Sequence, residues 1–138
     1  MIVKSPYLRK PQTPSVQLLR ELIDELTEQE EDAFLVMEDG SNRFIQAYWT
    51  PKGFDLEYQE EGERHFAAVE PMSPTETIER FLRYGCRDRN WRQGVVFVRL
   101  VYDPETQRWV LAPEERIVWK SRPYPIIVGK VLRWMGSK

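Results

Sequence analysis

Three polar side chains, Gln46, Glu57 and His65, are the residues of this chain whose chemistry could serve a functional site. His65 is the only histidine. A carboxylate beside an imidazole favours the imidazolium, and such a pair can act in general acid–base catalysis. More commonly the pair forms a structural hydrogen bond between two strands, and its third use is partner recognition.

Motifs for other kinds of chemistry are missing from the sequence. A single histidine and a single cysteine, Cys86, are too few for a zinc site and exclude an intramolecular disulfide. No nucleophile-elbow or phosphate-binding glycine motif occurs. Asp55 and Glu57 share a strand face, but functional carboxylates more often lie in loops. We therefore predict no catalytic residues, no metal and no cofactor.

The stretch from residue 43 to residue 69 is predicted to hold the three polar residues on one sheet. Aromatic and β-branched residues mark strands at 43–49, 54–59 and 64–69. Thr50-Pro51-Lys52-Gly53 is typical of a four-residue loop in which the glycine takes a positive φ. Glu60-Glu61-Gly62 is typical of a three-residue loop that ends on a left-handed glycine.

These two loops set a register that brings the polar residues into one row. The first loop pairs Gln46 with Glu57, and the second pairs Glu57 with His65. Directly opposed residues have Cβ atoms roughly 4.5–5.5 Å apart, so we expect contacts across three strands. The reverse face is apolar and is predicted to lie on the core. Its residues are Ile45, Ala47, Trp49, Phe54, Leu56, Tyr58, Phe66 and Ala68.

A fourth strand, Phe34–Glu38, is predicted to precede these three. The Asp39-Gly40-Ser41-Asn42 turn reads as a four-residue loop that leads into residue 43. This loop places Leu35 at the end of the polar row. The pairs that it sets on the core face are Val36 with Ile45 and Phe34 with Ala47.

Two helices are predicted outside this region. The first begins near Ser15, and apolar residues at helical spacing mark its core face. The second begins at Ser73-Pro74-Thr75-Glu76, which combines an N-cap serine, a proline at N1 and a capping-box glutamate. The predicted fold class is therefore α+β: a mostly antiparallel meander sheet with one helix before the first strand and one after the fourth.

The full chain, residues 1–138, is predicted to be a single α+β domain, because 138 residues suit one hydrophobic core. Residues 1–13 are expected to form an extended, proline-marked arm. Residues 117–138 are expected to form a basic, apolar C-terminal element, and periodicity does not decide between helix and strand for it. Further strands are predicted at residues 94–102, 108–112 and 116–120.

Charge and composition limit the classes of partner. The net charge of −2 predicts no bulk attraction to nucleic acid or membranes. Asp55 and Glu57 would repel phosphate from the face that exposes Phe44 and Tyr48, so no specific nucleic acid is expected. The N-terminus lacks the apolar core of a signal peptide, and no apolar run approaches the ~20 residues of a membrane span. We expect a cytoplasmic protein.

Two charged clusters leave alternatives open. The first helix and the residues after it present an acidic surface that includes Asp24, Glu28 and Glu31. This surface either keeps the protein soluble or docks a basic partner. A cluster of arginines lies on the second helix and in the loop after it, and either pairs with the acidic first helix or binds an anionic partner. Its members are Arg80, Arg83, Arg87, Arg89 and Arg92.

One part of the sequence resembles a family of small bacterial proteins. The residues that carry the resemblance are Phe44-Ile45-Gln46, Leu56-Glu57-Tyr58, His65-Phe66 and a helix that ends before a tryptophan such as Trp91. From about residue 15 to residue 91 the chain is similar to the immunity proteins of bacterial polymorphic-toxin systems, particularly the first-described immunity superfamily. The resemblance implies an α+β protein that binds and blocks a cognate toxin, with Gln46, Glu57 and His65 as site residues.

We therefore expect a non-enzymatic protein-binding domain. Its recognition surface is predicted to be either the exposed sheet face with Gln46, Tyr48, Glu57 and His65, or the acidic first helix. A second hypothesis is a small ligand-binding or enzyme domain centred on Glu57 and His65, which predicts a pocket at that row. A third is a homodimeric structural or assembly protein whose half-apolar outer face is buried between two copies.

Overall fold

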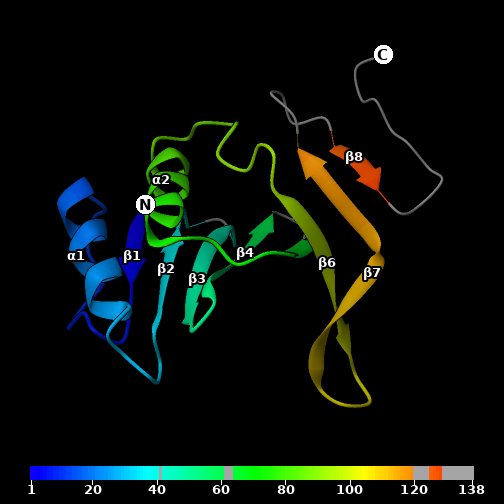
Figure 1. Cartoon of the computed structure of the whole chain (residues 1–138), viewed down its shortest axis with the longest axis horizontal. Helices are drawn as coiled ribbons and strands as arrows, with labels where there is room; N and C mark the ends of the chain where they lie inside the picture. Colours follow the sequence, from blue (N-terminus) through cyan, green and yellow to red (C-terminus); the bar gives the residue numbers. More distant parts are fainter. Residues whose placement is uncertain (41, 61–63, 120–124, 129–138) are drawn as a thin grey trace.

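The protein is α+β in the computed structural model, which describes residues 1–40, 42–60, 64–119 and 125–128. Within these residues eight strands form one sheet, in which every neighbouring pair is antiparallel and the strands follow one another in chain order (Figure 1). The elements are β1 (Ile2–Lys4), α1 (Val16–Leu26), β2 (Phe34–Glu38), β3 (Phe44–Thr50), β4 (Gly53–Glu60), β5 (Arg64–Ala68), α2 (Pro74–Gly85), β6 (Val96–Asp103), β7 (Arg108–Trp119) and β8 (Pro125–Val128).

Both helices contribute to the core on one face of this sheet. α1 packs against α2, and α2 packs over β3 and β4. Figure 1 shows the helices grouped at the β1–β4 end, while β6 and β7 continue beyond them as a long hairpin. Tyr58, Phe54, Phe81 and Phe97 are the largest fully buried side chains of the core. The opposite side of the sheet, which carries Gln46, Glu57 and His65, is called the outer face below.

α1 forms where its sequence supplies a cap and an apolar face. Ser15 is the N-cap, and its Oγ accepts a hydrogen bond from the Leu18 N–H at 3.1 Å. The residues at helical spacing on the inner side are buried: Leu19, Leu22, Ile23 and Leu26. The predicted start near Ser15 is thus confirmed.

α2 begins as its capping sequence predicts. Ser73 Oγ accepts a hydrogen bond from the Glu76 N–H at 3.1 Å, and Pro74 is the first helical residue. At the other end Arg87 takes a left-handed conformation (φ 59°). The Asp88 N–H then donates to Arg83 O at 2.9 Å across this left-handed residue, which satisfies a terminal carbonyl and turns the chain away from the helix.

The N-terminal arm contains an edge strand, which changes the predicted placement of the helices. β1 pairs with β2, and its central residue, Val3, lies opposite Met37 and is fully buried. On its other side, Val3 exchanges two backbone hydrogen bonds with Gln12. α1 therefore follows the first strand, and α2 follows the fifth rather than the fourth. The prediction was wrong because a three-residue strand with one inward side chain leaves no readable alternation.

The predicted register between β2 and β3 was wrong by one residue. Leu35 pairs with Ala47 and Met37 with Ile45, so Leu35 lies in the core and does not extend the polar row. Val36 occupies that place, opposite Gln46. The physical reason is the loop: Gly40 (φ 85°) and Asn42 (φ 58°) are both left-handed, and the Asp39 N–H donates to Arg43 O. The loop is therefore one residue shorter than predicted, and a shift of one residue exchanges the two faces. The loop's central residue, Ser41, lies outside the described residues.

The other two predicted registers fared differently. Between β3 and β4 the predicted pairing is confirmed throughout, with Gln46 opposite Glu57, and Gly53 has the expected positive φ of 131°. Between β4 and β5 the predicted pairing was wrong by two residues: His65 lies opposite Gln59, and Ala67 lies opposite Glu57. Because the displacement is even, each residue stays on its predicted face. Gly62, the predicted left-handed residue, lies outside the described residues.

β7 unites two predicted strands, at 108–112 and 116–120. Its register against β6 shifts between Val98 and Arg99, which pair with Arg116 and Ala112 respectively, so a bulge interrupts one continuous strand. After β7, residues 125–128 form strand β8, which pairs with β7. The rest of the predicted C-terminal element, residues 120–124 and 129–138, lies outside the described residues. Neither described helix has the length and apolar character needed to cross a membrane.

Candidate functional site

The outer face of β3, β4 and β5 brings Gln46, Glu57 and His65 into contact. Gln46 Nε2 donates to Glu57 Oε1 at 3.1 Å, and His65 Nε2 lies 2.9 Å from the same oxygen. One carboxylate oxygen thus joins an amide on one neighbouring strand to an imidazole on the other. The three residues are therefore in contact as predicted, although the predicted direct pairing of Glu57 with His65 was wrong.

The contact between Glu57 and His65 survives although the two residues are not directly opposed. His65 lies diagonally from Glu57, two positions along β5 from Ala67. Diagonal neighbours on a sheet face lie roughly 7–8 Å apart at their Cα atoms, which long side chains can span. The displacement therefore increased the distance that the two side chains must span, but Glu57 and His65 still contact each other.

His65 lies beneath aromatic side chains. The rings of Phe44 and Trp109 contact its imidazole, with centroids 5.6 Å and 5.3 Å away, and His65 is only 8% exposed. Leu100 of β6 lies directly opposite it. Trp109 was missed by sequence reasoning, because its place beside His65 depends on the pairing of β5 with β6 and of β6 with β7. No local loop encodes the pairing of β5 with β6, since α2 lies between these two strands in the chain.

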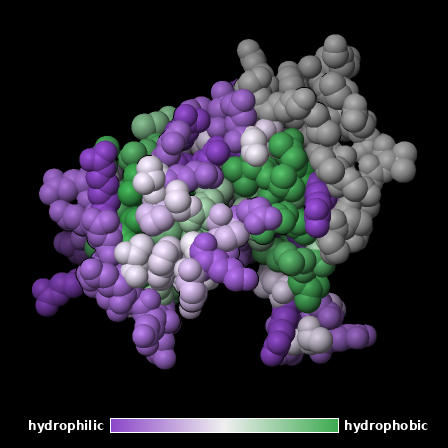
Figure 2. Space-filling model, in the orientation of Figure 1, coloured by the Kyte–Doolittle hydropathy of each residue, from purple (hydrophilic) through white to green (hydrophobic). Residues whose placement is uncertain are grey.

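Large aromatic and apolar side chains are exposed on both sides of the row. On one side Tyr48 is 46% exposed and stacks on Phe34, with ring centroids 6.4 Å apart. On the other side Trp109 is 49% exposed and contacts Tyr102, and Leu111 is 59% exposed. Figure 2 shows hydrophobic side chains in the β6 and β7 region beside the atoms drawn in grey. Such residues are costly to leave in water unless they serve a contact.

Two carboxylates give the centre of the outer face a negative character. Asp55 lies on β4 two residues from Glu57, opposite Tyr48. Partial burial, and then the charge of Glu57, raise the pKa of Asp55 above its usual value. Neither carboxylate has an ion pair with an arginine or lysine among the residues that the structure describes. A cation brought to this point would gain from both charges.

The acidic residues of the first helix lie elsewhere. Asp24, Glu28 and Glu31 are exposed, on α1 and in the segment that follows it. α1 belongs to the core side of the sheet, so the structure does not join these residues to the polar row. The outer face and the acidic surface are therefore two separate candidate surfaces.

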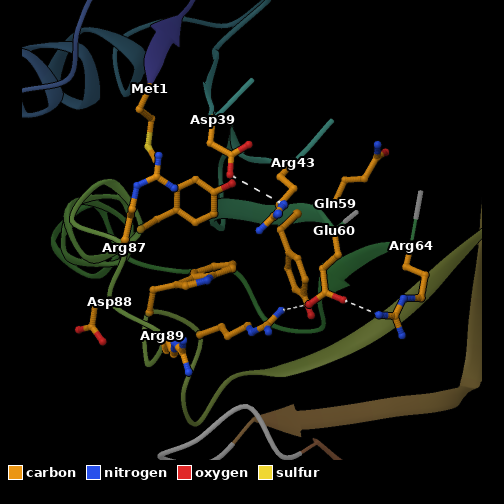
Figure 3. A pocket seen from close by; sticks show the side chains of 13 residues that line it. Met1, Asp39, Arg43, Gln59, Glu60, Arg64, Arg87, Asp88 and Arg89 are labelled. Carbon is orange, nitrogen blue, oxygen red and sulfur yellow. Dashed lines mark hydrogen bonds and ion pairs between the residues drawn. The ribbon is translucent and has the colours of Figure 1, made fainter. Parts of the chain in front are cut away.

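A cavity of about 820 Å³ lies beyond the end of α2, on the core side of the sheet. Figure 3 shows Glu60 and Arg64 from the sheet on one side of the cavity, and Arg87, Asp88 and Arg89 from the segment after α2 on the other side. Glu60 pairs with Arg64 at 3.2 Å and also with Arg92. No residue of the polar row lines this cavity.

Arginines of the cluster on and after α2 contact groups close to them in the chain or in the fold. Arg83 pairs with Glu79 at 2.7 Å, and Arg80 donates to the carbonyl oxygens of Trp91 and Gln93. Arg92 lies over the ring of Trp119, 3.5 Å from its centroid. Among the described residues no ion pair joins this cluster to α1, which leaves the first of the two alternatives, pairing with the acidic first helix, without support.

Tyr84, which lines the cavity, gives a pH-dependent prediction. Burial, and then the Asp39 carboxylate, raise the pKa of Tyr84 to about 12, against the opposing effect of Arg43 and Arg87. The unfolded chain loses this proton near pH 10 and the folded chain only near 12. Stability from this group is therefore complete below about pH 10 and falls as the pH rises to about 12. Urea unfolding at about pH 8 and pH 11 should show a smaller loss for Tyr84→Phe than for the parent.

The control for that measurement is Tyr102→Phe, because Tyr102 is half exposed. This variant should lose as much stability between the two pH values as the parent does. Equal losses for the parent, Tyr84→Phe and Tyr102→Phe would contradict the assignment of the effect to Tyr84.

Neither a search for metal ligands nor comparison with known proteins identifies a further site. Among the described residues no group of three or more histidine, cysteine, aspartate and glutamate side chains is placed to hold a metal ion. No protein-family model, curated protein or solved structure matches the chain.

Proposed function

We propose that this chain is a non-catalytic protein-binding domain that contacts its partner through the outer face, and that it acts as an immunity protein against a bacterial toxin. The observation that carries the first part is the set of exposed aromatic side chains on both sides of a polar, negatively charged centre. The sequence resemblance described above supplies the second part.

The composition of the outer face is that of a recognition surface. Tyrosine and tryptophan are enriched at interfaces, and a few such residues carry most of the binding energy when a partner covers them. Tyr48 and Trp109 offer such anchors, one on each side of the polar row. Both are held by neighbouring rings, which lowers the entropy lost when a partner immobilises them.

The charge of the centre defines the partner. Asp55 and Glu57 lie side by side without a basic residue of this chain to neutralise them, within the described residues. We infer a partner that places an arginine or lysine between apolar side chains, so that its cation meets these carboxylates while its apolar groups cover Tyr48 and Trp109. A second copy of the chain fits less well, because a two-fold axis here would bring like charges together.

The same geometry weighs against the enzyme hypothesis. His65 is covered by Phe44 and Trp109, and Glu57 Oε1 already contacts two side chains. None of Gln46, Glu57 and His65 lines the cavity at the end of α2. A general base needs a path to its substrate, and the imidazole of His65 has little exposed surface.

Binding to a purified partner tests the proposal. Proteins retained by the immobilised chain are identified, and the candidate with a basic surface is purified for calorimetry. Trp109→Ala and Tyr48→Ala should each weaken its binding at least about tenfold, as expected for hot-spot anchors. Both residues are about half exposed, so each variant should unfold within about 0.5 kcal/mol of the parent.

The matched control changes the acidic surface instead. Asp24→Ala, Glu28→Ala and Glu31→Ala combined should leave the affinity within about twofold, since none of these side chains contacts Gln46, Glu57 or His65. The reverse pattern would reject the outer face and favour the acidic helix. A toxin partner should arrest cell growth when expressed alone, and the parent chain should relieve the arrest while Trp109→Ala should not. A partner without toxicity would reject the immunity role.

A further inference from the structure

The arginines of the cavity at the end of α2 outnumber its acids. Among the described lining residues there are five arginines and three carboxylates. The arginines are Arg43, Arg64, Arg87, Arg89 and Arg92, and the acids are Asp39, Glu60 and Asp88. The cavity therefore carries an excess of positive charge in a chain whose net charge is −2.

The acids are committed to contacts within the protein. Glu60 is shared by Arg64 and Arg92, and Asp39 lies 4.0 Å from Arg43. Asp88 Oδ1 accepts a hydrogen bond from the Asn90 N–H at 2.9 Å. Arginines of the cavity therefore offset the charges of Glu60 and Asp39, while Asp88 keeps its charge and the lining as a whole has an excess of two guanidinium groups.

Arg87 and Arg89 are the arginines that stay available. Both are exposed, and neither guanidinium group has a hydrogen bond or an ion pair within the described part of the chain. They follow α2 directly, and the left-handed turn at Arg87 places them on the rim of the cavity. A guanidinium presents a rigid fork of donors that matches two oxygens of a phosphate.

Aromatic rings and a hydroxyl complete the lining. Tyr84 and Trp91 line the cavity and contact each other edge to face, with ring centroids 5.2 Å apart. The Tyr84 hydroxyl has no hydrogen-bond partner among the described residues, so it is available as a donor to an anionic ligand. A ring of the ligand could lie against these side chains.

We propose that this cavity binds a phosphorylated small molecule of about nucleotide size, with its phosphate on one of the two rim arginines, Arg87 or Arg89. The volume of about 820 Å³ lies within the range of ligand pockets, roughly 300–1,000 Å³. One feature opposes an anion: α2 ends here, and a helix C-terminus carries about half a negative charge. The excess of two guanidinium charges outweighs it. This site is independent of the outer face.

Calorimetry on the full chain tests the proposal, with AMP, ribose 5-phosphate and inorganic pyrophosphate as probes. The cavity variant is Arg87→Gln combined with Arg89→Gln. The control is Arg9→Gln combined with Arg83→Gln, which removes the same charge from residues outside the lining. All four side chains lie on the surface or in an exposed ion pair, so both variants should fold.

At least one probe should bind saturably at a single site. The cavity variant should weaken that binding at least about tenfold, and the control should stay within about twofold. Tyr84→Phe should weaken it about fivefold through the lost donor. Tighter binding of AMP than of ribose 5-phosphate would assign the base to the rings, and equal binding would assign a sugar phosphate. The absence of saturable binding for all three probes, or equal weakening by both double variants, would overturn the proposal.

Discussion

Replacement of Tyr58 by alanine should lower the free energy of unfolding by about 4 kcal/mol, as large-to-small changes at buried aromatic residues do. Tyr58 is 1% exposed, and its ring contacts those of Phe66, Trp91 and Phe97 at centroid distances of 4.8 to 5.1 Å. Its hydroxyl accepts a hydrogen bond from Trp119 Nε1 at 2.9 Å. Tyr58 therefore joins β4 to β5, β6, β7 and the segment after α2. Urea unfolding followed by circular dichroism measures the loss.

Two further variants keep this prediction testable if Tyr58→Ala fails to fold. Tyr58→Phe retains the ring and removes the acceptor of a buried indole N–H, which should cost about 1–2 kcal/mol. Tyr102→Ala, at a half-exposed tyrosine, should change stability by no more than about 0.5 kcal/mol. If Tyr58→Phe were as stable as the parent, the hydrogen bond from Trp119 would contribute nothing.

Gly53→Ala should cost about 3 kcal/mol for two reasons that act together. Gly53 has a φ of 131°, which L side chains rarely adopt. A Cβ added to it would lie 2.7 Å from the carbonyl oxygen of Met72, which is closer than real Cβ contacts. That carbonyl also accepts the Phe54 N–H at 2.8 Å, so it cannot move without breaking the bridge between the two segments. The midpoint of urea unfolding measures the effect.

Gly40→Ala is the matched control, because it separates the two reasons. Gly40 also has a positive φ, of 85°, but an added Cβ would meet nothing within 4 Å. This variant should cost only about 1 kcal/mol, from backbone strain alone. Equal losses for Gly53→Ala and Gly40→Ala would contradict the close approach of residue 53 to Met72.

The sequence was most informative where the turn chemistry was unambiguous. Pro51 and Gly53 define the loop between β3 and β4, and the register of that hairpin was predicted correctly. Ser15 and Ser73 likewise marked the starts of both helices, because an N-cap acts within one turn of its own helix. These features depend on residues that are neighbours in the chain.

Prediction failed where two loop lengths fit the same residues. Asp39-Gly40-Ser41-Asn42 suits a four-residue loop, but the left-handed φ of Asn42 lets a shorter loop close. Asparagine adopts this conformation more readily than most residues, and the sequence alone does not show when it does so. The faces of β2 were exchanged as a result, with Leu35 in the core.

The candidate site was predicted in its centre and missed at its margins. Gln46, Glu57 and His65 belong to strands joined by short loops, so local reasoning brought them together. Trp109 reaches His65 only through the pairing of β6 with both β5 and β7. The arginine-lined cavity likewise combines residues that flank the β2–β3 and β4–β5 turns with residues of α2 and the segment after it. Long-range pairing of this kind leaves no local signal.

The central claim is that a partner protein covers the outer face. Amide and indole NMR signals of the labelled chain, followed as the purified partner is added, test it most directly. The signals of Tyr48, Glu57 and the Trp109 indole should shift or broaden, while those of Asp24 and Glu28 should stay unchanged. Changes confined to α1, with the signals of the outer face unmoved, would contradict it.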